Sequence, residues 1–417
     1  MIRAEIITIG DELLIGQVLD TNSAWLGQRL NEIGIKVFQV STVGDNPDHM
    51  LTAFREASER AQLVIITGGL GPTKDDLTKK VLCDYFKTTL VFDQGSFQNI
   101  ERIFRARGRE VNEINRMQAE LPLNSAAMLN VNGTAPGMWF EENNVVYISM
   151  PGVPYEMKGI MHDVGLPRLK EKFQLPPVLH KNILTQGIGE SWLSELIAPW
   201  EDQLPSHIRL AYLPSTGMVR LRLTGSGRPE EILRSELEVQ TGKMLELAGK
   251  YVYGYDDDSL ESIVGALLRD RKQTLSIAES CTGGFIAHRI TSVPGCSDYF
   301  TGSIVAYDNK VKVNFLNVAR ELLDEKGAVC EETAVAMSEG ARRIFKTDYA
   351  LASTGIAGPG GGSDQKPVGL VWISLSLPDG KSVTRKLNLG TVRDRVIMEA
   401  CSHSLHLLIK KLKNEEI

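Results

Sequence analysis

The sequence predicts an α/β protein of three successive parts, and three observations support this class. Strand-like apolar runs alternate with helix-like segments over residues 1–170, which is typical of a doubly wound sheet with helices on both faces. The alternation returns in residues 256–417, whereas residues 171–255 show a smaller α+β pattern. A chain of 417 residues also exceeds one ordinary hydrophobic core. We therefore expect three domains with these boundaries.

The first part begins as a β-α-β-α-β series. The expected strands are Glu5–Ile9, Lys36–Val43 and Leu63–Thr67, and the expected helices are Ser23–Ile33, one that opens at Asn46-Pro47, and Leu77–Phe86. Asparagine is a favoured N-cap and proline a favoured first helical residue, so the second helix has a defined start. The nearly all-apolar third strand is typical of a strand buried in a parallel sheet.

The middle and last parts follow a proline-containing linker at residues 174–177. For the middle part we expect strands Val178–Thr185 and Val219–Thr224, helices Glu190–Ile197 and Glu230–Leu247, and a polar joint at 253–259. For the last part we expect strands 273–277, 303–306 and 349–353, and helices Leu260–Arg269, Phe285–Thr291 and Arg393–Leu412. The final helix carries an apolar stripe suited to core or dimer packing.

Composition excludes several classes of function. The net charge of −6 and pI near 5.8 argue against a general nucleic-acid surface, and aromatic residues are only 6% of the chain. No apolar span approaches the roughly 20 residues of a membrane helix, and no signal peptide is recognised. The five cysteines are scattered and lack a Cys-x-x-Cys pair, which favours reduced thiols over a disulfide frame or zinc site. We expect a cytoplasmic protein that binds neither nucleic acid nor membranes.

The stretch Ala278–Gly284 (AESCTGG) lies between a predicted strand and a predicted helix. The hydroxyl of Ser280 is therefore expected at a helix N-terminus, where unpaired backbone N–H groups can bind an anion or a developing oxyanion. This geometry suits acyl transfer, with Ser280 or the more nucleophilic thiol of Cys281 as the attacking group. It also suits a plain N-cap, which is the commoner role of serine before a helix.

A serine nucleophile needs a base, and no Ser-His-Asp spacing surrounds Ser280. Tyr307 and Lys312 follow the next strand-like run in the segment YDNKVK. A lysine can act as the base if burial lowers its pKa from about 10.4 towards 7 or 8. The sequence by itself does not distinguish Lys312 from Lys310, because most lysines are solvated.

Two further glycine-rich runs follow predicted strands. Thr354–Gly362 (TGIAGPGGG) has neither a P-loop nor a dinucleotide-binding fingerprint, and it fits a flexible turn or a phosphate cradle. Near the N-terminus, Gly10–Gly16 and Thr67–Thr78 follow two strands of the first sheet. Glycine N–H groups, hydroxyls and the adjacent carboxylates Asp75 and Asp76 can together hold a diphosphate and a divalent metal ion. The alternative is that these two acids only cap the next helix.

The last part resembles the C-terminal domain of the CinA (competence/damage-inducible) protein family. The matching motifs are AESCTGG, PGCSDYFTGSIVAYDNKVK, GAVCEETA and TGIAGPGG followed by KPVG. The resemblance implies deamidation of nicotinamide mononucleotide (NMN) without a cofactor, with Ser280 as the catalytic serine and Tyr307 and Lys312 as its activating partners. It implies substrate contacts from Thr282, Gly283, Gly284, Asn309, Thr354, Gly355, Ala357, Gly358 and Arg393, the last for the phosphate. Cys296, Asp308 and Cys330 depart from the usual family pattern.

The first part resembles the molybdopterin-binding-like N-terminal domain of the same family. The matching motifs are GDELLIG, DTNS, TGGLGPTKDD, NGTAPGM and MPGVPYEM. The resemblance implies an ADP-ribose pyrophosphatase that uses a divalent metal ion (Mg, Mn or Co). The implied metal ligands are Asp75, Asp76 and Asp11, and the implied substrate contacts are Gly10, Asp11, Asn22, Thr67, Gly68, Gly69, Gly71 and Thr73.

The middle part resembles the KH-like domain of longer family members. Its loop Gly187-Ile188-Gly189-Glu190 has an acid where a nucleic-acid phosphate would approach, so RNA binding is not expected. A spacer or dimer contact is the favoured role, and the resemblance implies a homodimer. Two hypotheses remain open at this point: a two-activity hydrolase of NMN and ADP-ribose, and a non-catalytic pterin- or nucleotide-binding protein of competence or the DNA-damage response.

Overall fold

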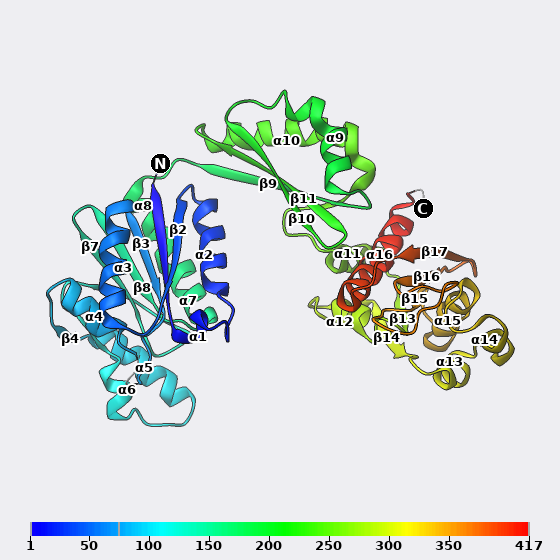
Figure 1. Cartoon of the computed structure of the whole chain (residues 1–417), viewed down its shortest axis with the longest axis horizontal. Coiled ribbons are helices and arrows are strands. Elements are labelled where there is room, and N and C mark those ends of the chain that lie inside the picture. Colours follow the sequence, from blue (N-terminus) through cyan, green and yellow to red (C-terminus); the bar gives the residue numbers. More distant parts are fainter. Residues whose placement is uncertain (1, 74–75, 416–417) are drawn as a thin grey trace. The chain divides into compact units, whose positions relative to one another are not determined.

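The structure is a computed structural model that describes residues 2–73 and 76–415. It separates into two compact units, residues 1–180 with 225–234 and residues 181–224 with 235–417 (Figure 1). The described residues form sheets of six, four, five and two strands, with helices packed on them. None of the helices formed by these residues is long and apolar enough to cross a membrane.

The N-terminal unit contains a six-stranded sheet with strand order β2-β1-β3-β8-β7-β6. The first four strands in this order are parallel, β7 runs antiparallel to them, and β6 is antiparallel to β7. The strands of this unit are β1 (Arg3–Ile9), β2 (Lys36–Val43), β3 (Leu63–Thr67), β4 (Leu90–Phe92), β5 (Glu120–Pro122), β6 (Ala126–Met128), β7 (Gly137–Glu142) and β8 (Val145–Met150). Its helices are α1 (Asp11–Leu14), α2 (Thr21–Glu32), α3 (Pro47–Arg60), α4 (Thr78–Tyr85), α5 (Gln94–Ala106), α6 (Glu113–Met117), α7 (Pro154–Ile160) and α8 (Leu166–Phe173).

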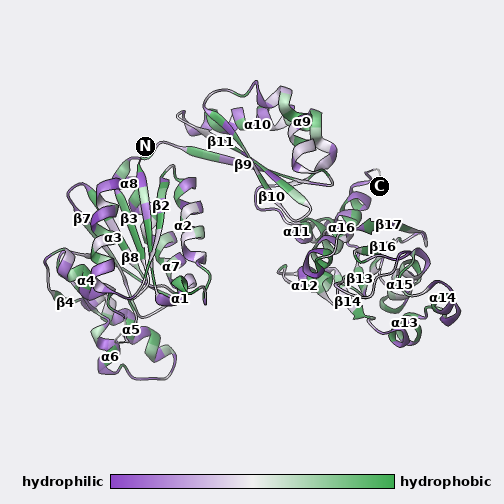
Figure 2. Cartoon of the chain, in the orientation of Figure 1, coloured by the Kyte–Doolittle hydropathy of each residue, from purple (hydrophilic) through white to green (hydrophobic). Residues whose placement is uncertain are grey.

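The two faces of this sheet carry separate hydrophobic cores. Ile6 belongs to the cluster that includes Leu26 and Leu30 of α2, whereas the next residue, Ile7, belongs to the cluster that includes Phe54 of α3. This alternation follows from the two-residue period of a strand, and it confirms the predicted doubly wound arrangement. Figure 2 shows that β3 and β8, in the centre of the sheet, are mostly hydrophobic.

The predicted start of α3 is also confirmed. The side chain of Asn46 accepts hydrogen bonds from the backbone N–H groups of Asp48 and His49, and Pro47 is the first helical residue. These bonds satisfy donors that a helix leaves unpaired at its first turn.

The middle segment folds as a four-stranded sheet in the order β10-β11-β9-β12. Its elements are β9 (Val178–Gln186), α9 (Glu190–Glu201), β10 (Ile208–Ser215), β11 (Met218–Ser226), α10 (Glu230–Ala248) and β12 (Val252–Tyr255). The prediction of a polar joint at 253–259 is partly wrong, because Tyr253 is buried in β12, which pairs with β9. Asp256 receives hydrogen bonds from the Lys181 side chain and the Asn182 N–H, so it holds a turn at the end of this short strand.

The C-terminal segment contains a five-stranded sheet in the order β14-β13-β15-β16-β17. Its strands are β13 (Leu275–Glu279), β14 (Phe300–Val305), β15 (Tyr349–Gly355), β16 (Leu370–Ser376) and β17 (Ser382–Asn388). Its helices are α11 (Leu260–Arg271), α12 (Phe285–Thr291), α13 (Asn309–Leu316), α14 (Arg320–Lys326), α15 (Glu331–Phe345) and α16 (Arg393–Lys413). The strands β14, β13 and β15 are parallel neighbours, so their carboxyl ends meet at one edge.

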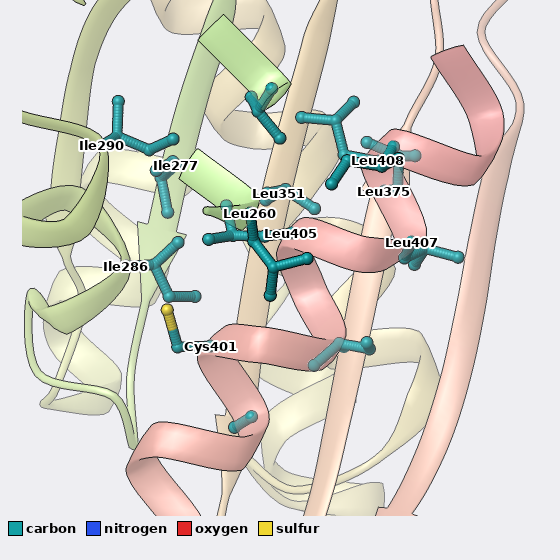
Figure 3. Packing of buried hydrophobic residues seen from close by; sticks show 14 of the residues in the cluster. Leu260, Ile277, Ile286, Ile290, Leu351, Leu375, Cys401, Leu405, Leu407 and Leu408 are labelled. Atoms are coloured by element: carbon teal, nitrogen blue, oxygen red, sulfur yellow. The ribbon is translucent and has the colours of Figure 1, made fainter. Parts of the chain in front are cut away.

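The predicted apolar stripe of α16 packs on this sheet. Cys401, Leu405 and Leu408 lie in one buried cluster with Ile277 of β13 and Leu351 of β15 (Figure 3). The opposite face of the sheet is covered by α15, whose Met337 and Ala341 are buried against alanines of β13 and β15.

Gly340 lets α15 lie directly against the end of α13. A Cβ atom at this position would stand 2.2 Å from the carbonyl oxygen of Leu316, which is the last residue of α13. Since that oxygen belongs to the backbone, the contact cannot be relieved by a side-chain rotation.

We predict that Gly340→Ala destabilises the C-terminal domain by about 1–3 kcal/mol, because overpacking forces the two helices apart. Thermal unfolding followed by calorimetry should show the loss. The matched control is Gly242→Ala in α10, where no heavy atom lies within 4 Å of the new Cβ, so the better helix propensity of alanine should leave stability unchanged or raised. Equal unfolding temperatures for the two variants would contradict this account.

Candidate functional sites

Three of the segments singled out in the sequence meet at the carboxyl edge of the C-terminal sheet. Glu279, at the end of β13, lies opposite Val305 of β14 and Ser353 of β15. The Ser280 N–H donates to the Ser353 carbonyl at 2.9 Å, and the Ala306 N–H donates to the Glu279 carbonyl at 2.7 Å. β13 ends at Glu279 and β14 at Val305, whereas β15 continues to Gly355. The loops that begin at Ser280 and Ala306 therefore lie next to the end of β15, which carries Thr354.

Ser280 is nearly buried, with 9% of its surface exposed. It stands between β13 and α12 in a turn that needs two left-handed glycines, Gly283 at φ +62° and Gly284 at φ +99°. Its hydroxyl makes no hydrogen bond to any other part of the described chain and is therefore free to meet a ligand.

The carboxylate of Glu279 occupies the start of α12. It is fully buried and accepts hydrogen bonds from the Thr282 hydroxyl and from the backbone N–H groups of Gly284, Ile286 and Ala287, at 2.7–3.0 Å. The expectation that unpaired N–H groups of this helix face a ligand is therefore wrong for these three groups. A fixed carboxylate satisfies them, which also stabilises the positive end of the helix.

Lys312 is buried at this edge of the sheet, whereas Lys310 is exposed. Only 1% of the Lys312 surface is accessible, and its Nζ donates to the carbonyls of Ala306 at 2.8 Å and Tyr307 at 3.0 Å. Burial lowers the pKa of the Lys312 amine, although the nearby charge of Asp308 acts in the opposite direction. Asp308 itself caps α13, where its side chain accepts from the Lys310 N–H.

Cys281 has an environment unlike that of a nucleophilic thiol. It is buried, and loss of hydration raises the pKa of its thiol to about 12, with the Glu279 charge as a further contribution in the same direction. A thiol is a strong nucleophile only as the thiolate, so this environment disfavours Cys281 as the attacking group.

Tyr307 and Arg393 join the rim of this edge. The Tyr307 ring is 58% exposed, and its hydroxyl accepts a hydrogen bond from Arg393 Nη2 at 3.2 Å. Arg393 Nη1 donates to the carbonyl of Gly358 at 2.7 Å, so the start of α16 is tied to the glycine-rich loop. Lys312 contacts the backbone carbonyl of Tyr307, and no bond between described residues joins its amine to the phenol.

The remaining predicted contacts of this domain divide between structural and exposed positions. The Thr282 hydroxyl bonds Glu279 and Ser353, and the Thr354 hydroxyl donates to the Ala328 carbonyl, so both serve the local fold. Asn309 is exposed in the first turn of α13. Gly355 ends β15, and Ala357 and Gly358 belong to the loop that follows, which Arg393 contacts at the Gly358 carbonyl.

A second candidate site is a cavity of about 500 Å³ in the N-terminal unit. It lies at the carboxyl ends of β1, β3 and β8, where parallel sheets usually bind ligands. Six of the residues predicted from the sequence line it: Asn22, Thr67, Gly68, Gly69, Gly71 and Asp76. Four residues that sequence reasoning did not single out line it as well: Glu12, Asp20, Gln118 and Glu156.

Asn22 is held firmly at the wall of this cavity. Only 8% of its surface is exposed, and its Nδ2 donates to the Thr67 hydroxyl at 3.2 Å and to the Gly152 carbonyl at 2.7 Å. Gly68 and Gly69 have left-handed backbones, at φ +117° and +64°, and a Cβ on Gly68 would lie 2.2 Å from the Ile9 carbonyl oxygen. The close approach of β1 and β3 at this point therefore depends on glycine.

The predicted acids of this site are placed differently from one another. Asp11 accepts from the Asp45 N–H and donates its own N–H to Asp45, and neither Asp11 nor Gly10 lines the cavity. Asp76 lines the cavity, and its carboxylate accepts hydrogen bonds from the N–H and hydroxyl of Thr73. Thr73 itself does not line the cavity. The residue that caps α4 is Leu77, so helix capping does not explain Asp76.

Asp75 lies outside the described residues. Among the residues that the structure describes, no three His, Cys, Asp or Glu side chains are close enough together to hold a metal ion. The acids therefore do not form a preassembled metal cage of described side chains, although they supply the oxygen atoms that hard cations prefer.

The available signal for Glu279 was an acid inside the AESCTGG motif, at the end of a predicted strand and directly before Ser280. Glu12 and Glu156 stand inside the GDELLIG and MPGVPYEM motifs, where only the fold shows which acid faces the cavity.

We predict that Glu279→Gln destabilises the C-terminal domain by about 1–3 kcal/mol, because a carboxamide cannot accept all four buried hydrogen bonds. Thermal unfolding measures the change. The matched control is Glu332→Gln, since Glu332 is exposed at the start of α15. An unfolding temperature equal to that of the control would show that the Glu279 carboxylate does not hold this turn.

Comparison with known proteins covers the whole chain. Residues 5–171 match the family described as probable molybdopterin binding domain, residues 180–254 the damage-inducible protein CinA KH domain, and residues 257–412 the CinA C-terminal domain. A CinA-like protein of Cytophaga hutchinsonii is 50% identical over 412 residues, which are 99% of this chain and 98% of that protein.

The comparison also found two further similar proteins. A putative competence-damage inducible protein of Moorella thermoacetica is 41% identical over 413 residues, 99% of each chain. The crystal structure of a competence/damage inducible protein from Agrobacterium tumefaciens is 35% identical, covering 37% of this chain and 95% of that one, with a TM-score of 0.36. The full-length identity to the curated relatives shows that the chain belongs to the CinA family, with a molybdopterin-binding-like, a KH-like and a CinA C-terminal domain.

Proposed function

We propose that the chain is a bifunctional hydrolase of pyridine nucleotides. In this proposal the C-terminal domain converts NMN and water to nicotinic acid mononucleotide and ammonia, and the N-terminal domain cleaves ADP-ribose to AMP and ribose 5-phosphate. The observation that carries the proposal is that the Lys312 amine is buried and bonded to the carbonyls of Ala306 and Tyr307, at the same edge of the sheet as the free hydroxyl of Ser280. A neutral amine in this position is the base that a serine nucleophile requires.

The deamidation proceeds in two steps. The Ser280 Oγ attacks the carboxamide carbon while the Lys312 amine accepts the hydroxyl proton, and the tetrahedral intermediate then expels ammonia, which takes that proton from Lys312. Water attacks the resulting ester, Lys312 accepts a proton from the water, and cleavage of the C–O bond returns this proton to the Ser280 oxygen and releases the acid. Burial supports this cycle because it disfavours the protonated amine at rest.

Arg393 is the group best placed to recognise the nucleotide phosphate. Its side chain is exposed, and it has N–H groups beyond the two that Tyr307 and Gly358 accept. Because the phenol of Tyr307 is bonded to Arg393, we assign Tyr307 the role of fixing that guanidinium and lining the rim. Its backbone carbonyl also helps to position Lys312.

The N-terminal activity is supported by the cavity at the ends of β1, β3 and β8. Its volume of about 500 Å³ suits a nucleotide, and its glycine turn at 68–71 permits close approach of backbone N–H groups to phosphates. A bound divalent metal ion would polarise the phosphoryl oxygens and activate water, with Asp76 among the residues that could hold it. The alternative is a protein that binds a nucleotide or pterin without turnover, and the assays must distinguish it from a hydrolase.

We predict that separate substitutions abolish separate activities. Ser280→Ala should reduce ammonia release from NMN by roughly 10³-fold or more while AMP release from ADP-ribose with Mn²⁺ is unchanged, and Asp76→Asn should have the opposite pattern. Cys281→Ala is the matched control and should retain most ammonia release. Loss of ammonia release in Cys281→Ala would show that the thiol, and not the Ser280 hydroxyl, is the nucleophile. Binding of either substrate without turnover would favour the non-catalytic alternative.

We predict that deamidation increases as pH rises and reaches a plateau below the ordinary lysine pKa of 10.5. The sign follows from the direction of the shift, because burial lowers the pKa of Lys312 and only the neutral amine can accept the serine proton. Single-turnover rates measured against pH test this expectation. Lys312→Arg should remove the activity at every pH, whereas Lys310→Arg should keep both rate and profile. A Lys312→Arg variant with normal rates would exclude lysine as the base.

A further inference from the structure

The start of α13 carries a negative charge that the proposed mechanism leaves without a role. The exposed side chain of Asp308 caps this helix by accepting a hydrogen bond from the Lys310 N–H at 2.7 Å. The Lys312 N–H donates to the Asp308 carbonyl at 3.3 Å, so the two residues lie one helical turn apart. A full charge therefore stands at the beginning of the helix that holds the proposed base.

The side chain of Lys312 turns back toward this end of α13. Its Nζ donates to the carbonyl of Tyr307 at 3.0 Å, and this carbonyl belongs to the peptide group that joins Tyr307 to Asp308. The planar trans geometry of that group places the Asp308 Cα within about 6 Å of the amine. No hydrogen bond or ion pair among the described residues joins the amine to the Asp308 carboxylate. The carboxylate thus acts on the amine through its electrostatic field and not through direct contact.

Opposing influences act on the Lys312 amine. Its burial lowers the pKa, and the positive end of the α13 dipole, next to the amine, acts in the same direction. The charge of Asp308 raises the pKa. An ionised Cys281 would also raise it, but burial raises the pKa of that thiol to about 12, so the thiol carries no charge near neutral pH. Asp308 is therefore the charge that opposes burial.

The other charged side chains around α13 have different partners or lie elsewhere. The Glu279 carboxylate is held by the N–H groups at the start of α12. Helix α15 meets the opposite end of α13, where Gly340 lies against Leu316 and Arg343 donates to the Leu316 carbonyl. The remaining charged residues of α15 are Arg342, close to Gly340 in the sequence, and the acids Glu331, Glu332 and Glu339, which bond Thr384, Lys326 and Ser382 in this order. Of these groups, only Asp308 adjoins a carbonyl that holds the amine.

We propose that the carboxylate of Asp308 sets the pH range in which Lys312 is neutral, and thereby the pH range of deamidation. This inference rests on the proposed function of the C-terminal domain. Asp308 acts on the reaction only through Lys312, so it is a positioning residue and not a catalytic one. Its negative charge favours the protonated amine, and removal of the charge makes the amine neutral at lower pH. An uncharged cap would therefore let deamidation reach its plateau at lower pH.

NMR titration of the full chain tests the effect on Lys312 without turnover. The lysines are labelled with ¹³C at Cε, and the Lys312 signal is identified by its absence in Lys312→Arg. Asp308→Asn removes the charge but keeps a good N-cap, so it should lower the titration midpoint of this amine by about half a pH unit or more. Asp308→Ser, a second uncharged cap, should give the same shift. The matched control, Asp324→Asn in α14, removes an equal exposed charge from the same domain and should leave the midpoint unchanged.

Salt and kinetics supply two further readouts. Because Asp308 is exposed, about 1 M NaCl should screen its charge, lower the midpoint in the unsubstituted chain and leave that of Asp308→Asn nearly unchanged. Single-turnover ammonia release from NMN, measured against pH, should show the same shift to lower pH in Asp308→Asn and Asp308→Ser. A purely structural role of the cap moves neither the salt dependence nor the pH profile, and calorimetric unfolding temperatures check that the variants keep their stability.

The outcomes separate this inference from the proposed function. A shifted Lys312 midpoint in a chain that releases no ammonia from NMN would remove the deamidase and leave the effect of Asp308 on the amine standing. Equal midpoints in Asp308→Asn, Asp308→Ser and the unsubstituted chain, or an equal shift in Asp324→Asn, would overturn the inference. A shift that salt does not reduce, or ammonia release whose pH profile does not move with the amine, would overturn it as well.

Discussion

The proposed chemistry of the C-terminal domain depends on the burial of one amine, that of Lys312. Lys312 reaches the end of the sheet from inside α13, and two backbone carbonyls at the end of β14 receive its hydrogen bonds. Carbonyl dipoles satisfy the amine but do not offer the full negative charge that would keep it protonated. The position of α13, and hence of this amine, depends on its packing against α15 through a residue without a side chain.

The turn that carries Ser280 is stabilised by the negative charge of the Glu279 carboxylate. Glu279 accepts hydrogen bonds from N–H groups at the start of α12, whereas the hydroxyl of Ser280 in the same turn has no hydrogen bond to the described residues. The same arrangement separates the two candidate nucleophiles. The hydroxyl of Ser280 is unpaired, whereas the thiol of Cys281 is buried and kept protonated, with the neighbouring carboxylate contributing.

The two candidate sites differ in how their charged groups are arranged. In the C-terminal site, backbone N–H groups hold the Glu279 carboxylate and backbone carbonyls hold the Lys312 amine. In the N-terminal cavity, the carboxylates of Glu12, Asp20, Asp76 and Glu156 line the wall, and the described acids do not gather into a metal site.

The amino-acid sequence by itself determined part of the elements and the loops that carry candidate chemical groups, whereas β8, β16, β17 and α15 were not predicted. Strands such as Lys36–Val43 and Leu63–Thr67 and the helix Phe285–Thr291 have the predicted bounds, because their apolar patterns and flanking glycines or caps act locally. The motifs also identified the family, and they indicated Ser280 together with a nearby lysine. The strand at 208–215 and the strand at 252–255 were missed, since the first has partly exposed residues and the second has only four.

Only the tertiary structure decided which side chain of each motif faces the site. Lys310 and Lys312 are two residues apart, and helical rotation places one in solvent and the other under the sheet edge. Asp11 and Glu12 are adjacent, yet the first faces the Asp45 backbone and the second lines the cavity. The burial and orientation of these side chains depend on how strands and helices pack in space. The same holds for Glu279, which pairs with N–H groups up to eight residues away. A local sequence pattern does not encode this packing.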